Sequence, residues 1–245
     1  DAECADGQKI RGALQKLAKR VTERYGPPEN RQKAIAQLGE MGTPAALETL
    51  CLRFTARSEP GITDDEEKET VRGMLVEAGE TAVGPLERFI HAEEDGVAWG
   101  LRALSGILPE PRVLEVVVRE LTHLGKIYTK DPEKKLVLLT WLREHHAGAA
   151  GAELEAALLP LLEDFSDDVR ITAVRALVSV SLGEKAREAL IELLLRDRDN
   201  ARVRGEVLEA MAALGADVKG HRPTVEGLLV EPFYLDREGR VKKRG

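Results

Sequence analysis

The residues best suited to chemistry in this sequence are its histidines, and their spacing does not favour a metal site. His145 and His146 follow Glu144 and come nearest to a cluster of metal ligands. Adjacent residues on a helix diverge by about 100°, so the two imidazole rings cannot both face one ion. We interpret them as helix-end residues, where positive charge is favourable. The sequence therefore predicts no metal ligands and no cofactor.

Motifs for phosphate binding and for nucleophilic or metal-assisted catalysis are absent from the sequence. It contains no G-x-x-x-x-G-K-[ST], no G-x-G-x-x-G and no G-x-S-x-G. It also lacks C-x-x-C and H-E-x-x-H, the spacings typical of zinc sites. We therefore predict that the protein is not an enzyme and has no catalytic residues.

The remaining candidates for chemistry are Arg and His side chains that could bind the carboxylates of a partner protein. Arg holds a carboxylate through two parallel hydrogen bonds. We hypothesise that such residues line a groove for an acidic or amphipathic segment of another protein. The alternative is that these charges only keep the protein soluble. The candidates are Arg53, Arg57, Arg88, His91, Arg112, Arg119 and His123.

These side chains share one surface only if the helices that carry them are stacked, and an internal repeat predicts such a stack. Residues 166–183 read SDDVRITAVRALVSVSLG, and residues 198–215 read RDNARVRGEVLEAMAALG. Both segments carry a Val-Arg pair near the start and end in Leu-Gly. A period of about 34 residues indicates stacked helix pairs, because one pair cannot bury its apolar face alone.

The composition supports an all-α protein that does not bind nucleic acid broadly. Apolar residues make up 43% of the 245 residues and aromatic residues only 4%, so the core must consist of Leu, Ala and Val. The net charge is −7, which makes nucleic acid an unlikely partner, because binding phosphates requires many Lys and Arg. No apolar run approaches the roughly 18–20 residues that span a bilayer.

Proline and glycine residues mark where the helices begin and end. Thr43-Pro44 and Asp131-Pro132 each place a capping side chain before a proline at the first helical position. Gly39, Gly183 and Gly215 fall where helices should end. The predicted elements are a leading helix at 7–25 and helix pairs at 29–39 with 44–57, 64–78 with 81–92, 96–107 with 111–124, 132–146 with 151–164, 167–182 with 184–196, and 200–214 with 218–229.

Two segments resemble a known repeat family. The segment Asp167-Asp168-Val169-Arg170-x-x-Ala173-x-x-Ala176-Leu177 resembles the first helix of a HEAT repeat, and residues 79–86 resemble the turn between its helices. The resemblance covers about residues 28–230 and suggests a small bacterial HEAT-repeat protein. It implies a right-handed α-solenoid of about six antiparallel helix pairs, with second helices lining a concave face, in a single domain over 1–230. It also implies a scaffold or adaptor that binds a partner protein.

Other HEAT-like classes are alternatives to a scaffold. Alkylpurine DNA glycosylases need a basic groove, aromatic side chains and a catalytic carboxylate, but the acidic balance argues against this class. For bilin lyase-like proteins, this sequence shows no characteristic motif. HEAT-like di-iron enzymes use His-Glu dipeptides, and the sequence has none. The glycosylase candidates would be Trp99, Trp141, Arg102, Arg143 and Asp95.

The two ends of the sequence depart from the repeat. Residues 231–245 lack helical periodicity and predict an extended arm or a short hairpin, in which Phe233 and Tyr234 either cap the last helix pair or dock a partner. Cys4 and Cys51 either form a disulfide or remain a loose and a buried thiol. The sequence begins at Asp1 rather than at Met, so a leader segment that was removed is one alternative. A cytoplasmic location is slightly favoured over a periplasmic or membrane-anchored one, and the oligomeric state is not predicted.

The alignment of the repeats makes one prediction about stability. Leu177 and Leu194 should be buried between neighbouring helix pairs, so Leu177→Ala should lower the free energy of unfolding by about 2–5 kcal/mol. Urea unfolding followed by circular dichroism measures this loss. An unchanged unfolding midpoint would show that the predicted register of the repeats is wrong.

Overall fold

The computed structural model describes residues 2–125, 127–146, 151–180 and 184–244, with side chains described from residue 8 onward. The described residues form two compact units, Asp1–Val113 and Leu114–Gly245. The single domain over 1–230 and the handedness of the superhelix stay predictions. Within the described residues, helices account for nearly all regular structure. The prediction of an all-α fold built from repeated helix pairs is confirmed.

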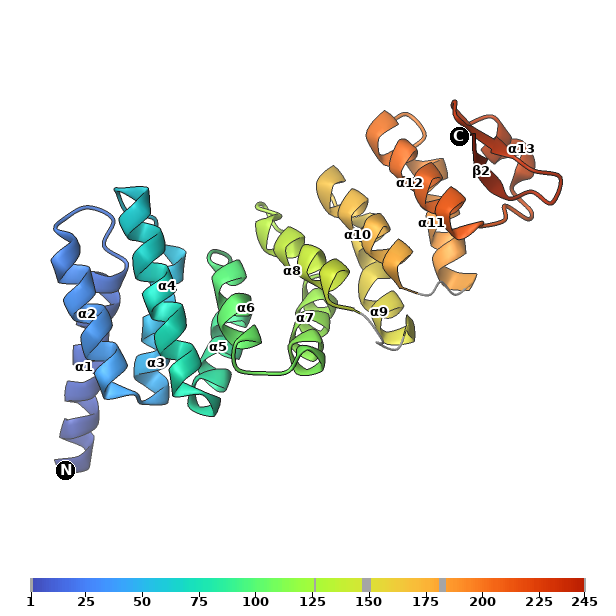
Figure 1. Ribbon diagram of the computed structural model, residues 1–245. Helices are drawn as coiled ribbons and strands as arrows, with labels where there is room; N and C mark the ends of the chain where they lie inside the picture. Colours follow the sequence, from blue (N-terminus) through green and yellow to red (C-terminus); the bar gives the residue numbers. More distant parts are fainter. Residues whose placement is uncertain (1, 126, 147–150, 181–183, 245) are drawn as a thin grey trace. The chain divides into compact units, whose positions relative to one another are not determined.

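The first unit contains two complete helix pairs preceded by one helix and followed by another (Figure 1). Helix α2 packs on α1 and α3, while α4 packs on α2 and α6, and α3 packs on α5. The helices are α1 (Ala2–Val21), α2 (Pro28–Met41), α3 (Pro44–Cys51), the 3-10 helix η1 (Leu52–Thr55), α4 (Gly61–Ala78), α5 (Glu80–Ala92) and α6 (Val97–Ser105).

The turn between α2 and α3 shows why the local sequence specifies a helix pair. Gly42 ends α2 in the left-handed conformation, at φ 57°, which costs a residue without a Cβ no strain. The Thr43 hydroxyl then accepts a hydrogen bond from the Ala46 amide, and Pro44 occupies the first turn of α3. One glycine, one cap and one proline therefore reverse the chain direction.

The second unit places its first helices next to one another in sequence order. Helix α10 packs on α8 and α12, and α11 packs on α12. Helix α7 (Glu110–Leu124) contains the boundary between the units. The other elements are α8 (Glu133–Glu144), α9 (Gly151–Leu158), the 3-10 helix η2 (Leu159–Glu163), α10 (Asp167–Ser179), α11 (Glu184–Arg196), α12 (Ala201–Leu214), α13 (Arg222–Glu226), β1 (Phe233–Leu235) and β2 (Val241–Lys243).

The core consists of aliphatic side chains at helical spacing. Leu177 and Leu194 are fully buried, which confirms their predicted positions. Val169 and Val203, which match across the repeat, are likewise fully buried. Small and aliphatic side chains allow neighbouring helices to approach closely, which explains how a core with few aromatic residues fills its space.

A buried or nearly buried cation near the start of a first helix recurs in both units. The Arg170 guanidinium donates to the Asp164 carbonyl at 2.6 Å and lies 2.9 Å from the Asp197 carboxylate. The Lys135 ammonium likewise donates hydrogen bonds to the Ile127 carbonyl, at 2.8 Å, and to the Asp164 carboxylate, at 2.6 Å. Each cation therefore joins the loop before its own helix to an acidic residue of the next repeat.

The same arrangement occurs in the first unit, where Arg31 on α2 takes the role of the cation. Arg31 is fully buried, donates to the Glu23 carbonyl at 3.4 Å and forms two hydrogen bonds with the Glu67 carboxylate. A buried charge is tolerated only when it is paired and hydrogen-bonded, so these contacts fix the spacing between repeats.

The predicted element bounds are wrong at several ends. The leading helix ends at Val21 rather than 25, and α3 ends at Cys51, where η1 continues the chain. The predicted helix at 218–229 is reduced to the short α13, which has Gly220 before it, Pro223 in its first turn and Gly227 at its end.

Residues 233–243 form an antiparallel hairpin, one of the two conformations considered for the C-terminus. Tyr234 pairs with Lys242, and the turn runs through Asp236 and Gly239. Strand β2 packs on α12, and Val241 is fully buried. The hairpin therefore covers the last long helix of the second unit.

Candidate functional site

The structure corrects the prediction that Arg53 lies on a partner-binding surface. Arg53 is fully buried at the start of η1. Its guanidinium donates to the Asp64 carboxylate at 2.6 Å, to the Glu67 carboxylate at 2.9 Å and to the Ala56 carbonyl at 2.9 Å. The side chain therefore forms its hydrogen bonds within the protein and cannot contact a partner.

Arg53 belongs to a buried network of charges that also contains Arg31 and Lys68. The Glu67 carboxylate accepts hydrogen bonds from both Arg31 and Arg53. Burial alone would raise the pKa of the Asp64 carboxyl, but hydrogen bonds from Lys68, Arg53 and Ser58 outweigh it and hold the pKa well below its ordinary value. Asp64 is thus ionised at neutral pH, and the network links α2, η1 and α4.

The other predicted cations of the first unit lie at its surface. Arg57 is exposed after η1, and His91 is exposed near the end of α5. The Arg88 guanidinium lies 2.8 Å from the Glu48 carboxylate, with about half of its side chain exposed. The structure therefore brings Arg88 on α5 together with an acid on α3 rather than with another predicted cation.

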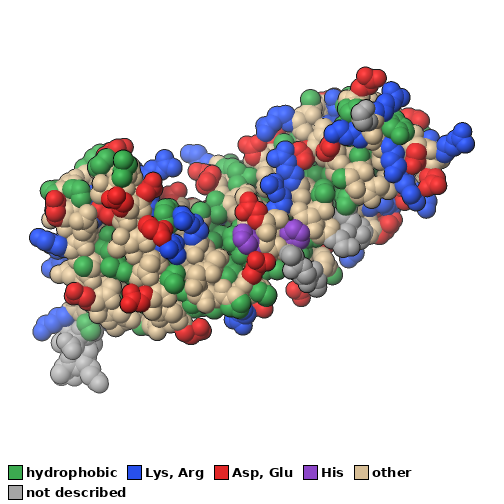
Figure 2. Space-filling model, in the orientation of Figure 1, with side chains coloured by type: hydrophobic (Ala, Val, Ile, Leu, Met, Phe, Trp, Pro, Cys, Tyr) green, Lys and Arg blue, Asp and Glu red, His purple; other side chains and the backbone are tan. Residues whose placement is uncertain are grey.

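The three predicted cations on α7 are also exposed, but the unit boundary separates them. Arg112 belongs to the first unit, whereas Arg119 and His123 belong to the second. The Arg119 guanidinium lies 3.9 Å from the buried Glu120 carboxylate. Whether the other six predicted residues, all of them exposed, share one groove stays a prediction. On the face shown in Figure 2, acidic and basic side chains lie interspersed on each unit.

Phe233 and Tyr234 are placed by the C-terminal hairpin. Phe233 is half-buried, with the Lys243 ammonium 6.0 Å from its ring, and Tyr234 is exposed beneath the Arg244 guanidinium. These contacts between the two strands stabilise the hairpin. Docking of a partner on Tyr234 stays a prediction.

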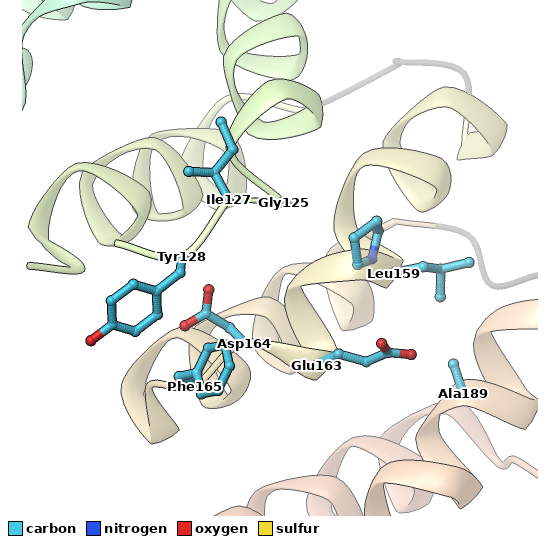
Figure 3. A pocket seen from close by; sticks show the side chains of 9 residues that line it. Gly125, Ile127, Tyr128, Leu159, Glu163, Asp164, Phe165 and Ala189 are labelled. Atoms are coloured by element: carbon cyan, nitrogen blue, oxygen red, sulfur yellow. The ribbon is translucent and has the colours of Figure 1, made fainter. Parts of the chain in front are cut away.

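The sequence analysis missed a cavity of about 580 Å³ in the second unit (Figure 3). Its wall includes two exposed aromatic side chains, Tyr128 after α7 and Phe165 before α10. Their rings pack edge to face, with centroids 5.2 Å apart. The described lining residues are Gly125, Ile127, Tyr128, Leu159, Pro160, Glu163, Asp164, Phe165 and Ala189.

Two loops position these aromatic side chains, and one buried lysine joins the loops. Lys135 binds the Ile127 carbonyl in the first loop and the Asp164 carboxylate in the second. The Asp164 carboxylate also accepts a hydrogen bond from the Ser166 amide, and the Ser166 hydroxyl caps α10. Tyr128 and Phe165 each lie next to a residue held by Lys135, so their backbone positions are fixed together.

Comparison with known proteins identifies the segment that forms one wall of this cavity. Residues 155–235 match the family model for HEAT repeats. Residues 155–235 are therefore similar to HEAT repeats. The HEAT-repeat segment runs from within α9 to the end of β1 and contains Leu159, Glu163 and Phe165. No curated protein and no solved structure matches the chain.

Phe165 stands out within the HEAT-repeat segment because a large apolar side chain occupies a loop. About 80% of its surface is exposed, and Tyr128 is about 66% exposed. The two residues are separated by slightly more than one repeat, so no short motif contains both. The sequence does contain one signal that could have revealed them. In two successive repeats, an aromatic residue follows shortly after the end of a helix.

The aromatic candidates for enzymatic chemistry pack against neighbouring side chains. Trp99 stacks on Phe54, at 5.9 Å between ring centroids, and lies beneath the Arg102 guanidinium. The His145 ring stacks on Trp141 at 4.4 Å. Among the residues whose side chains are described, no group of three His, Cys, Asp or Glu is placed to hold a metal ion.

Cys51 is fully buried, and burial raises the pKa of its thiol to about 12. It is a free thiol among the described residues, whereas the side chain of Cys4 lies outside them, so their pairing stays untested. None of the described helices has both the length and the apolar character of a membrane span.

The buried network predicts how the stability of the first unit depends on pH. Because the folded-state pKa of Asp64 lies below the ordinary value of 3.8, its stabilisation is complete above about pH 4 and is lost as the pH falls. We expect Asp64→Asn to lower the free energy of unfolding at pH 7 on the order of 2 kcal/mol and to flatten the decline in acid.

Urea unfolding of a Trp141→Phe background tests this expectation, because Trp99 fluorescence then reports on the first unit. Glu66→Gln, a change to an exposed carboxylate on the same helix, is the control and should leave the acid decline unaltered. Parallel pH profiles for the parent and the Asp64→Asn variant would contradict the role of Asp64.

Proposed function

We propose that the protein is a non-enzymatic scaffold that binds a partner protein. HEAT repeats commonly serve as protein-interaction scaffolds, and residues 155–235 match that family. The buried charges described above are used to join repeats. The function therefore resides in side chains that the repeats present to solvent.

The exposed Tyr128–Phe165 pair carries this proposal. Large aromatic side chains are usually buried, and an exposed apolar patch on a folded protein typically marks a binding site. Aromatic side chains contribute strongly to interfaces, because they bury a large area and have few rotamers to lose. Ile127, about 42% exposed, extends the same apolar surface. The pair lies on loops that Lys135 holds, so little ordering accompanies binding.

The predicted second-helix cations are a second candidate surface. In the first unit, Arg57 and Arg88 are exposed and offer guanidinium groups to an acidic partner segment. Arg88 already pairs with Glu48, so a partner carboxylate would compete with that contact. The aromatic pair is therefore the stronger candidate for the main binding site. Arg88 would add at most a secondary contact with the partner.

The proposal predicts that removing the aromatic pair abolishes partner capture without unfolding the protein. Residues 1–245 and the double variant Tyr128→Ala/Phe165→Ala are compared by affinity capture from lysate of the source organism and mass spectrometry. Because both side chains are mostly exposed, the change in stability should stay within about 0.5–1 kcal/mol. A protein retained by the parent should be absent from the double variant.

Tyr25→Ala is the matched control, because Tyr25 is about 84% exposed and lies in the first unit. This control should retain the same protein as the parent. Equal capture by the double variant would refute the role of Tyr128 and Phe165. Loss with Arg88→Glu instead would move the site to the second-helix surface.

A further inference from the structure

The described side chains that line the cavity and carry charge are acidic. Glu163 and Asp164 contribute carboxylates, whereas no Lys or Arg is found among the lining residues that the structure describes. A partner that enters this cavity therefore meets negative charge and aromatic or aliphatic surface. The whole chain has a net charge of −7, which also favours approach of a basic segment.

The two carboxylates are not equally available to a partner. The Asp164 carboxylate lies 2.6 Å from the Lys135 ammonium and accepts the Ser166 amide, so its charge is compensated. Glu163 is exposed at the end of η2, and it forms no ion pair or hydrogen bond among the described residues. Glu163 is therefore the lining carboxylate that can bind a cation from outside.

Glu163 and the aromatic pair lie at different sides of the lining. Figure 3 shows Glu163 directed toward the side on which Ala189 lies, while Tyr128 and Phe165 lie together at the other side. Leu159 and Pro160 contribute aliphatic surface to the same lining. A matching ligand thus needs an apolar group at one end and a cationic group at the other.

We infer that this cavity binds a partner segment in which an Arg or Lys stands next to a large apolar side chain. The apolar side chain packs on Tyr128 and Phe165, and the cation binds the Glu163 carboxylate. Arg suits this position best, because its planar guanidinium pairs with a carboxylate through two hydrogen bonds and its aliphatic stem packs on apolar surface. An acidic segment would place like charges together. The inference rests on the proposed function.

Selection of a random dodecapeptide library on phage tests the chemistry of the occupant. The library is selected in parallel on the parent protein and on Glu163→Lys, and one peptide enriched on the parent is then titrated by fluorescence anisotropy. We expect the enriched peptides to share an Arg or Lys beside an apolar residue. Binding of the titrated peptide should weaken about tenfold or more in Glu163→Lys and to a smaller extent in Glu163→Gln.

Glu153→Lys is the matched control, because it introduces the same charge change at an exposed glutamate in the first turn of α9. It should bind the peptide as the parent does. Peptides without Arg or Lys, or equal affinity for the parent and Glu163→Lys, would overturn the inference. If such peptides still lose binding in Tyr128→Ala/Phe165→Ala, the scaffold proposal stands. If no peptide is enriched on the parent protein, both the inference about this cavity and the scaffold proposal are contradicted.

Discussion

A buried or nearly buried cation that joins one repeat to the next is the interaction on which the other features of each unit depend. Arg31, Lys135 and Arg170 each bind a carbonyl of the preceding loop and a carboxylate of the following repeat. Removing one partner of such a pair leaves an uncompensated buried charge, which costs about 3–5 kcal/mol. Aliphatic packing permits several helix registers, because Leu, Val and Ala fit many neighbours. The directional hydrogen bonds of the cation select one of them.

The candidate binding site follows from one of these cations. Lys135 holds the loop that carries Tyr128 and, through Asp164, the loop that carries Phe165. Two aromatic side chains that would otherwise sample many positions are thereby presented side by side. A site built on such loops loses little conformational entropy on binding, and that is the physical reason for assigning function to the aromatic pair.

The sequence predicted the repeat because helix packing leaves a local pattern. Val169 and Val203 occupy equivalent buried positions, and Thr43-Pro44 begins a helix as its capping chemistry requires. The prediction for Arg53 was wrong, because a charged side chain in a predicted second helix is expected to be exposed unless its partners are known. Those partners, Asp64 and Glu67, come from the next helix pair. The Tyr128–Phe165 pair was missed for the same reason, since its two members meet only after the repeats stack.

Site-specific photo-crosslinking in cells of the source organism tests the central claim most directly. Phe165→p-benzoylphenylalanine places the reactive group at the aromatic pair, and the same replacement of Tyr25 places it on an exposed surface of the first unit. The account predicts a discrete crosslinked protein from position 165 and none from position 25. Absence of a crosslink at position 165, or the same products from both positions, would contradict a binding site at Tyr128 and Phe165.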